Sequence, residues 1–178
     1  MRPKKGKRWI QGVFKPVHPE KYAGDPTSII YRSSWELRVF SRLDLDDEVI
    51  AWGSEECVVR YYDPVTKRSR RYFPDLVVKY RDGRVEMWEI KPSDQQVRPE
   101  KGKKSQKTFV KQATTWMTNQ AKWEAAKTLC ESWGWEFRVL NEMDLGIRSK
   151  RKRAPARGSL SPTSALTRGG DRERPQSA

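Results

Sequence analysis

Three side chains near the middle of the chain have the types and spacing needed to hold a metal ion and cut a phosphodiester bond. Pro74-Asp75 is followed by Glu89, Ile90 and Lys91. Mg²⁺, or Mn²⁺ in its place, binds carboxylate and carbonyl oxygens and keeps waters, one of which can become a nucleophile. The pattern therefore predicts that Asp75, Glu89 and the carbonyl of Ile90 bind metal, and that Lys91 orients the water or stabilises charge on the phosphate. The alternative is a cluster of cross-strand salt bridges on a solvated sheet face.

The turn at residues 81–83 decides whether the two carboxylates meet. A two-residue turn would send Asp75 and Glu89 to opposite faces, because a one-residue slip inverts every side chain of a strand. A three-residue turn that ends with Gly83 in the left-handed region pairs Asp75 with Glu89. The apolar pattern favours this second register. In this register one face of the hairpin carries Asp75 and Glu89. The opposite face carries the apolar residues Pro74, Leu76, Val78, Trp88 and Ile90.

Glu36 is a candidate fourth catalytic residue and a further metal ligand. It lies on the same side of a predicted helix as Val39, Phe40 and Leu43, so it points inward. Charged side chains are rarely buried there without a partner. It can complete a capping box with Ser33, contact the metal directly or through water, or do both.

The remaining pattern supplies the elements that would position these residues. In chain order it predicts a helix from residue 33 to about 44–47, strands at 57–62, 70–80 and 85–91, a helix at 115–133 that ends before Gly134, and a strand at 135–140. The order α-β-β-β-α-β predicts an α/β fold with a mixed sheet flanked by helices. We expect a basic N-terminal arm over 1–25, one domain over 26–147, and a basic, disordered tail over 148–178.

The charge of the chain is +14, and most of it lies at the two ends. A further basic stretch runs from Lys91 to Lys111, with seven basic residues against two acids. Such a distribution implies a polyanionic partner, most simply DNA. The alternative for the tail is a solubilising segment that binds nothing specific. The candidate phosphate contacts are Arg70, Arg71, Lys101, Lys103, Lys104 and Lys107.

Other classes of site are excluded by the residues that the chain lacks. Cys57, Cys130 and His18 are its only cysteines and histidine, which leaves neither a structural zinc site nor a Ser-His-Asp triad. Two cysteines are typical of a reduced intracellular compartment. We also expect no membrane segment and no signal peptide, because no apolar run is long enough.

Longer strings of residues resemble a known nuclease superfamily, PD-(D/E)xK, and within it the head-completion nucleases of T-even-like bacteriophages. The strings are KYAGDPT at 21–27, IYRSSWE at 30–36, WGSEE at 52–56, RYFPD at 71–75, EIKP at 89–92 and NQAKWEAA at 119–126. The resemblance covers roughly residues 20–145. That family in turn resembles the transposase A endonuclease of cut-and-paste bacterial transposons. The basic tail after Arg148 is not a feature of the family.

The resemblance implies a restriction-endonuclease-like core and a Mg²⁺-dependent DNA endonuclease, with exonuclease activity as an added possibility. It implies that the protein acts late in head assembly, before tail joining, by trimming packaged DNA. Phage head or portal proteins would be its partners, in the host cytoplasm or in the virion. By the match of motifs, Asp75, Glu89 and Lys91 would be active-site residues, with Glu36 a fourth. The alternatives are a transposon or repair endonuclease subunit and a non-enzymatic DNA-binding or portal-plugging protein.

Overall fold

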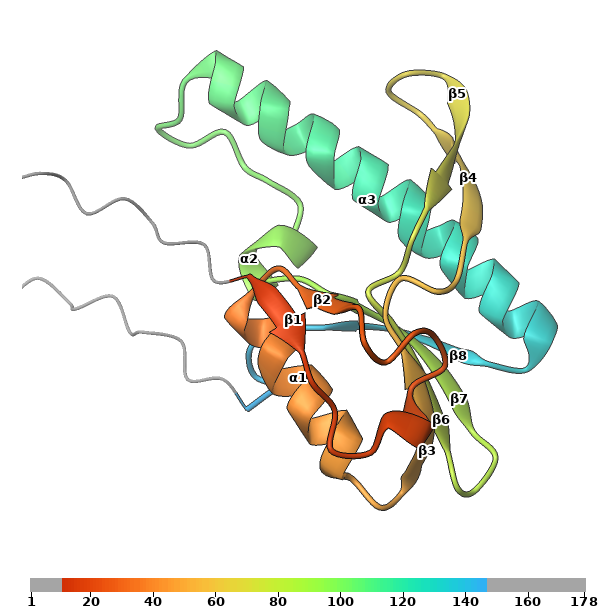
Figure 1. The fold of residues 1–178 in the computed structure, drawn as a ribbon. Helices are drawn as coiled ribbons and strands as arrows, with labels where there is room; N and C mark the ends of the chain where they lie inside the picture. Colours follow the sequence, from red (N-terminus) through yellow and green to blue (C-terminus); the bar gives the residue numbers. More distant parts are fainter. Residues whose placement is uncertain (1–10, 147–178) are drawn as a thin grey trace, which may run out of the picture.

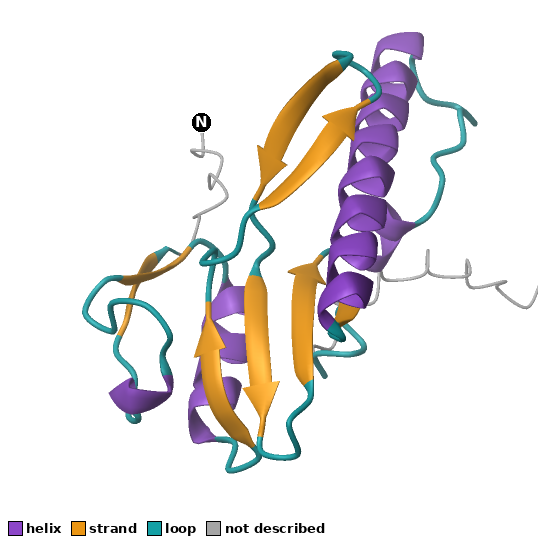
Figure 2. Cartoon of the chain, turned by 90° about the vertical axis from the view of Figure 1, so that its right-hand side faces the viewer, coloured by secondary structure: helices purple, strands orange, loops and turns teal. Residues whose placement is uncertain are grey.

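A four-stranded mixed sheet lies between two helices in the computed structural model, which describes residues 11–146 (Figures 1 and 2). The strand order is β3-β6-β7-β8, with β8 parallel to β7 and the other pairs antiparallel. The strands are β3 (Val49–Gly53), β6 (Leu76–Tyr80), β7 (Val85–Ile90) and β8 (Glu136–Leu140). With α1 (Ser34–Leu45) before them and α3 (Gln106–Trp133) before β8, the order α-β-β-β-α-β and the mixed sheet are confirmed.

Each face of the sheet packs on one helix. Val39, Phe40 and Leu43 of α1 share a buried cluster with Leu76, Val78, Trp88 and Ile90, on the face that the apolar alternation predicts. Ala126 and Cys130 of α3 pack on Met87 from the other side. The sheet is therefore buried on both faces, which holds the ends of β6 and β7 in fixed positions.

The first strand of the sheet is not the one expected from sequence. That position belongs to β3, whereas β4 (Val59–Asp63) pairs with β5 (Arg68–Tyr72) in a separate hairpin. The single strand expected over 70–80 is also wrong, because it is divided into β5 and β6. The division falls at Pro74, which has no amide hydrogen to donate to a ladder.

The helix expected over 115–133 begins nine residues earlier, at Gln106. The side chain of Ser105 caps it by accepting a hydrogen bond from the Thr108 amide at 3.2 Å. The early turns are mostly exposed and so carry no apolar stripe that would reveal a helix. The predicted end is confirmed, since Gly134 has a left-handed φ of 71°. The short helix α2 (Ser93–Gln96) precedes it, between the predicted strand at 85–91 and the predicted helix at 115–133.

The segment before α1 packs on the domain. It contains β1 (Gly12–Phe14), paired antiparallel with β2 (Ile29–Tyr31), and the 3₁₀ helix η1 (Pro19–Lys21). Phe14 is buried against Phe40 and Trp52, with ring centroids 5.8 Å and 5.9 Å away. The buried carboxylate of Asp44 accepts the amides of Val17 and His18. The expected arm residues 1–10 and the tail beyond 146 lie outside the described residues. None of the helices within residues 11–146 is long and apolar enough to cross a bilayer.

Candidate active site

The turn between β6 and β7 is the three-residue turn that the apolar pattern favours. The amide of Gly83 donates to the carbonyl of Tyr80 at 3.1 Å, and the amide of Tyr80 donates to the carbonyl of Arg84 at 2.9 Å. Gly83 has a φ of +90°, a value that side chains rarely tolerate. Leu76 is consequently paired with Trp88, which confirms the predicted register.

The next position along the hairpin brings Asp75 opposite Glu89. Asp75 lies just before β6, and Glu89 lies near the end of β7. A carboxylate oxygen of Asp75, Oδ2, accepts the backbone amide of Ile90 at 2.7 Å. The carboxylate of Asp75 is therefore held at the end of β7, beside the residues of the Glu-x-Lys motif.

The side chain of Glu89 is buried, and each of its two carboxylate oxygens has a partner. Lys91 Nζ lies 2.7 Å from Oε1, and the Tyr72 hydroxyl donates to Oε2 at 2.6 Å. Tyr72 comes from β5, in the hairpin outside the sheet. Sequence reasoning missed Tyr72, and its place directly before Phe73-Pro74-Asp75 is the only signal that could have drawn attention to it.

The site holds more negative than positive charge. Burial and the charge of Glu89 raise the pKa of Asp75 to about 7, although Lys91 and the Ile90 amide act in the opposite direction. Burial disfavours the charge on Lys91, but Glu89, Asp75 and Glu36 outweigh it and raise the pKa of Lys91. Lys91 therefore interacts with several carboxylates at once, and a further cation would reduce the repulsion between them.

Glu36 has the capping role that its position allows. Its Oε1 accepts the Ser33 hydroxyl and its Oε2 accepts the Arg32 amide, both at 2.8 Å, while Ser33 Oγ accepts the Glu36 amide at 3.1 Å. Glu36 also lines a cavity of about 180 Å³ together with Asp75 and Glu55. An ion pair between Arg32 and Glu55 lies in the wall of the same cavity.

The donor atoms at this site are those that a hard divalent cation prefers. They are the carboxylates of Asp75 and Glu89, the carbonyl of Ile90 and the nearby carboxylate of Glu36. Within residues 11–146, no three His, Cys, Asp or Glu side chains are already gathered as a metal-binding group. Asp75 and Glu89 lie beside each other with Lys91 as the ion-pair partner of Glu89, and a bound cation would favour the charged form of Asp75, whose pKa burial and Glu89 raise, so the residues present fit such an ion.

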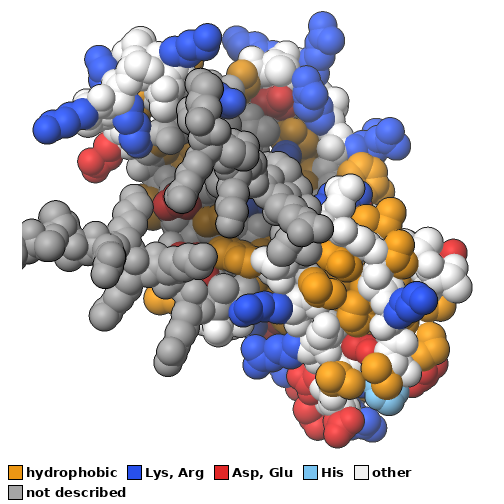
Figure 3. Space-filling view, turned by 60° about the vertical axis from the view of Figure 1, so that its left-hand side comes forward, with side chains coloured by type: hydrophobic (Ala, Val, Ile, Leu, Met, Phe, Trp, Pro, Cys, Tyr) orange, Lys and Arg blue, Asp and Glu red, His pale blue; other side chains and the backbone are white. Residues whose placement is uncertain are grey.

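The candidate phosphate contacts lie in two regions. Arg70 and Arg71 are exposed on β5, where Arg70 is paired with Asp63 at 3.2 Å. The four lysines are exposed in the loop before α3 and in its first turn: Lys101, Lys103, Lys104 and Lys107. Lysine and arginine side chains gather along the upper part of the surface in Figure 3, and acidic side chains gather at the lower end.

Two comparisons with known proteins identify the family of this chain. The family described as TnsA-like endonuclease N terminal matches residues 46–142, a range that contains Asp75, Glu89 and Lys91 but not Glu36. The head completion nuclease of Enterobacteria phage T4 is 40% identical over 135 residues. That alignment covers 74% of this chain and 90% of the relative. The resemblance expected from the sequence strings is confirmed.

Proposed function

Because the chain belongs to the TnsA-like endonuclease family, we infer that it is a phage nuclease that acts in head completion. It hydrolyses phosphodiester bonds, and DNA is its substrate. The near full-length similarity to a head completion nuclease favours this role over that of a transposon or repair endonuclease subunit. The observation that carries the proposal is the meeting of Asp75, Glu89 and Lys91 at the adjoining ends of β6 and β7.

We propose that cleavage depends on a divalent ion, Mg²⁺ or Mn²⁺, held by Asp75 and Glu89 with the carbonyl of Ile90. When bound, such an ion supplies the charge that lowers the pKa of a water and stabilises the phosphate. The support is the excess of buried negative charge, which a dication would balance. Glu36 contributes a further carboxylate, directly or through water, because it lines the same cavity as Asp75.

Lys91 and Tyr72 then act on the two oxygens of Glu89. Lys91 is kept protonated by its carboxylate neighbours, so it stabilises negative charge on the phosphate and does not serve as a base. Tyr72 is a positioning residue, since its hydroxyl fixes the orientation of Glu89. The side chains of the site therefore come from β5, from β7 and the residue after it, and from the residue before β6.

The wider substrate and partners follow from the same role. Packaged DNA is the proposed substrate, with Arg71 and the lysines before α3 as phosphate contacts. Proteins of the phage head or portal are proposed partners, and the host cytoplasm during assembly is the proposed location. Trimming of DNA ends would require exonuclease activity beside endonuclease activity.

Purified protein incubated with supercoiled and with linear DNA tests the proposal. Cleavage should require Mg²⁺ and stop with EDTA, and it should be lost in Asp75→Ala and in Lys91→Ala. Cutting of linear DNA from its ends would add the exonuclease activity. A wild-type protein that binds DNA but never cuts it would instead support the non-enzymatic, portal-plugging alternative.

A further inference from the structure

The β4–β5 hairpin extends beyond the sheet and carries positive charge that the catalytic site does not use (Figures 1 and 2). Its basic residues are Arg60, Lys67, Arg68, Arg70 and Arg71. Its one acidic residue, Asp63, is buried and paired with Arg70 at 3.2 Å. The hairpin therefore presents a net positive surface to solvent.

Arg60 and Arg71 are directly opposite each other on adjacent strands. They lie on the opposite face of the hairpin from Val59, Tyr61 and Tyr72, which are buried in the cluster that includes α3 residues. Both arginines are exposed, and neither forms an ion pair with any described residue. Like charges directly opposite each other destabilise a sheet, so this pair indicates an anionic partner from outside the domain.

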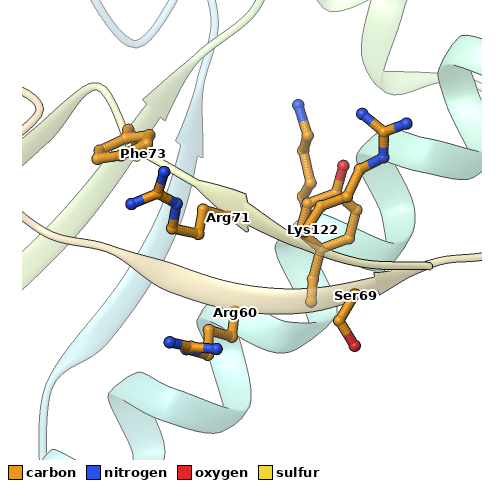
Figure 4. Close-up of a pocket in the computed structure, with 7 residues that line it drawn as sticks. Arg60, Ser69, Arg71, Phe73 and Lys122 are labelled. Atoms are coloured by element: carbon orange, nitrogen blue, oxygen red, sulfur yellow. The ribbon is translucent and has the colours of Figure 1, made fainter.

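A cavity of about 700 Å³ lies along this hairpin (Figure 4). Arg60, Arg70, Arg71 and Lys122 line it, and none of its lining residues is a carboxylate. Lys122 comes from α3, where its Nζ lies 5.4 Å from the centroid of the Tyr72 ring. Figure 4 shows Arg71 beside Phe73, which is 44% exposed at the end of the hairpin.

The hairpin leads directly into the catalytic site. Tyr72 directs its hydroxyl to Glu89, while its neighbour Arg71 projects from the opposite face of the same strand. Four residues of chain span at most about 13 Å, which limits the separation of Arg71 and Asp75 along the backbone. Phosphates on one strand of B-DNA advance about 3.4 Å along the axis. A backbone held by Arg71 would thus lie within roughly four nucleotides of the bond that is cut.

We propose that the β4–β5 hairpin holds the phosphate backbone of duplex DNA beside the catalytic carboxylates, with Arg60 and Arg71 as the principal contacts. Lys122 lines the same groove, and Arg70 contributes less because Asp63 neutralises it. The proposal rests on the nuclease function and names the part of the substrate that the protein holds next to the scissile bond. Contacts with phosphates carry no sequence information, so the binding is independent of sequence.

The double variant Arg60→Gln/Arg71→Gln tests the hairpin, and Lys79→Gln/Arg81→Gln is the matched control. Lys79 and Arg81 are exposed and lie at the opposite end of β6 from Asp75. Binding of a labelled duplex of arbitrary sequence is measured in EDTA at several salt concentrations. The hairpin variant should lose affinity on the order of tenfold, and the slope of log affinity against log salt should decrease by about 2. The control variant should retain the wild-type affinity and slope.

Equal affinities and slopes for the two variants would overturn the hairpin proposal. If the wild type still cuts DNA in that case, the nuclease function stands and only the hairpin is wrong. A wild type that neither binds nor cuts DNA would overturn both. A lower affinity of the hairpin variant would not come from unfolding, because removing the repulsion between two arginines should leave the melting temperature equal or higher.

Arg71→Glu sharpens the test further. It places a carboxylate opposite Arg60, so the melting temperature should rise while affinity for the duplex falls below that of the double variant. A rise in both stability and affinity would contradict the proposal, because it would mean that the arginine pair has no anionic partner in DNA.

Discussion

Strand β7 carries a buried glutamate near each end, and the two are neutralised in different ways. Glu86 is 1% exposed and accepts hydrogen bonds from the Trp88 indole at 2.7 Å, Arg84 at 2.9 Å and Arg138 at 3.2 Å. Two guanidinium groups and an indole therefore surround one carboxylate. Its charge is balanced within the domain, so it has no need of an external cation.

Glu89 lies three residues later, on the other face of the strand, and its charge is not balanced in this way. Among the described residues its one ion-pair partner is Lys91, and Asp75 adds a second negative charge. Burial therefore does not distinguish the proposed catalytic carboxylate, Glu89, from the structural one, Glu86. The difference lies in the balance of charge around it: Glu86 is fully compensated, whereas the pair of Asp75 and Glu89 leaves room for a dication.

The largest expected effect is on cleavage by Glu89→Gln. The substitution keeps the shape of the side chain and removes the charge that would hold the ion, so the rate should fall on the order of 10³-fold or more. Metal-dependent cutting of linear DNA measures it. The melting temperature without metal should not fall, and undiminished cutting would remove Glu89 from the site.

The second expectation concerns stability against pH in the absence of metal. Since the pKa of Asp75 is raised from 3.8 to about 7, the folded protein binds more protons than the unfolded chain between these values. Stability should therefore fall as the pH rises from about 4 to about 7, by at most about 4 kcal/mol. Urea unfolding in EDTA across this range measures the loss.

Two comparisons make that expectation specific to Asp75. Asp75→Asn should lose most of the slope, and Mg²⁺ should restore stability above pH 7, because the ion binds the deprotonated carboxylates. A slope that persists unchanged in Asp75→Asn would mean that other groups cause it.

Glu86→Gln, the counterpart of Glu89→Gln, should lower the stability of the fold and leave cleavage unchanged. It leaves two arginines without their carboxylate, but both are partly exposed and can be rehydrated, so the cost should be about 2 kcal/mol. Denaturant unfolding measures this loss. Cleavage per folded molecule should remain at the wild-type level, and its loss would contradict the purely structural role of Glu86.

The smallest expected effect is that of Tyr72→Phe. Loss of the hydroxyl frees Oε2 of Glu89, so kcat or the affinity for Mg²⁺ should decrease about tenfold. A titration of cleavage against Mg²⁺ separates the two. A merely structural tyrosine would lower the melting temperature and leave the Mg²⁺ titration unchanged.

Much of the fold was predictable because its signals are local. Ser33 and Glu36 mark the start of α1, and Gly134 marks the end of α3 through a left-handed φ. The extent of α3 was not predictable in the same way, since its exposed early turns have no apolar face. The identity of the first sheet strand was also hidden, because β3 and β4 are both plausible strands and their partners are distant in sequence.

The sequence by itself determined the register of the β6–β7 hairpin, which brings Asp75, Glu89 and Lys91 together. The turn at Asp82-Gly83 can be closed with two or three residues, and the alternation of apolar residues favours the three-residue turn. Only the tertiary structure decided that Tyr72 holds Glu89, that Glu36 shares a cavity with Asp75, and that Arg60 stands unpaired opposite Arg71. Those contacts join elements that are far apart along the chain or depend on which strands pair. Local pattern cannot supply them, because they form only when the apolar faces of the sheet, α1 and α3 come together.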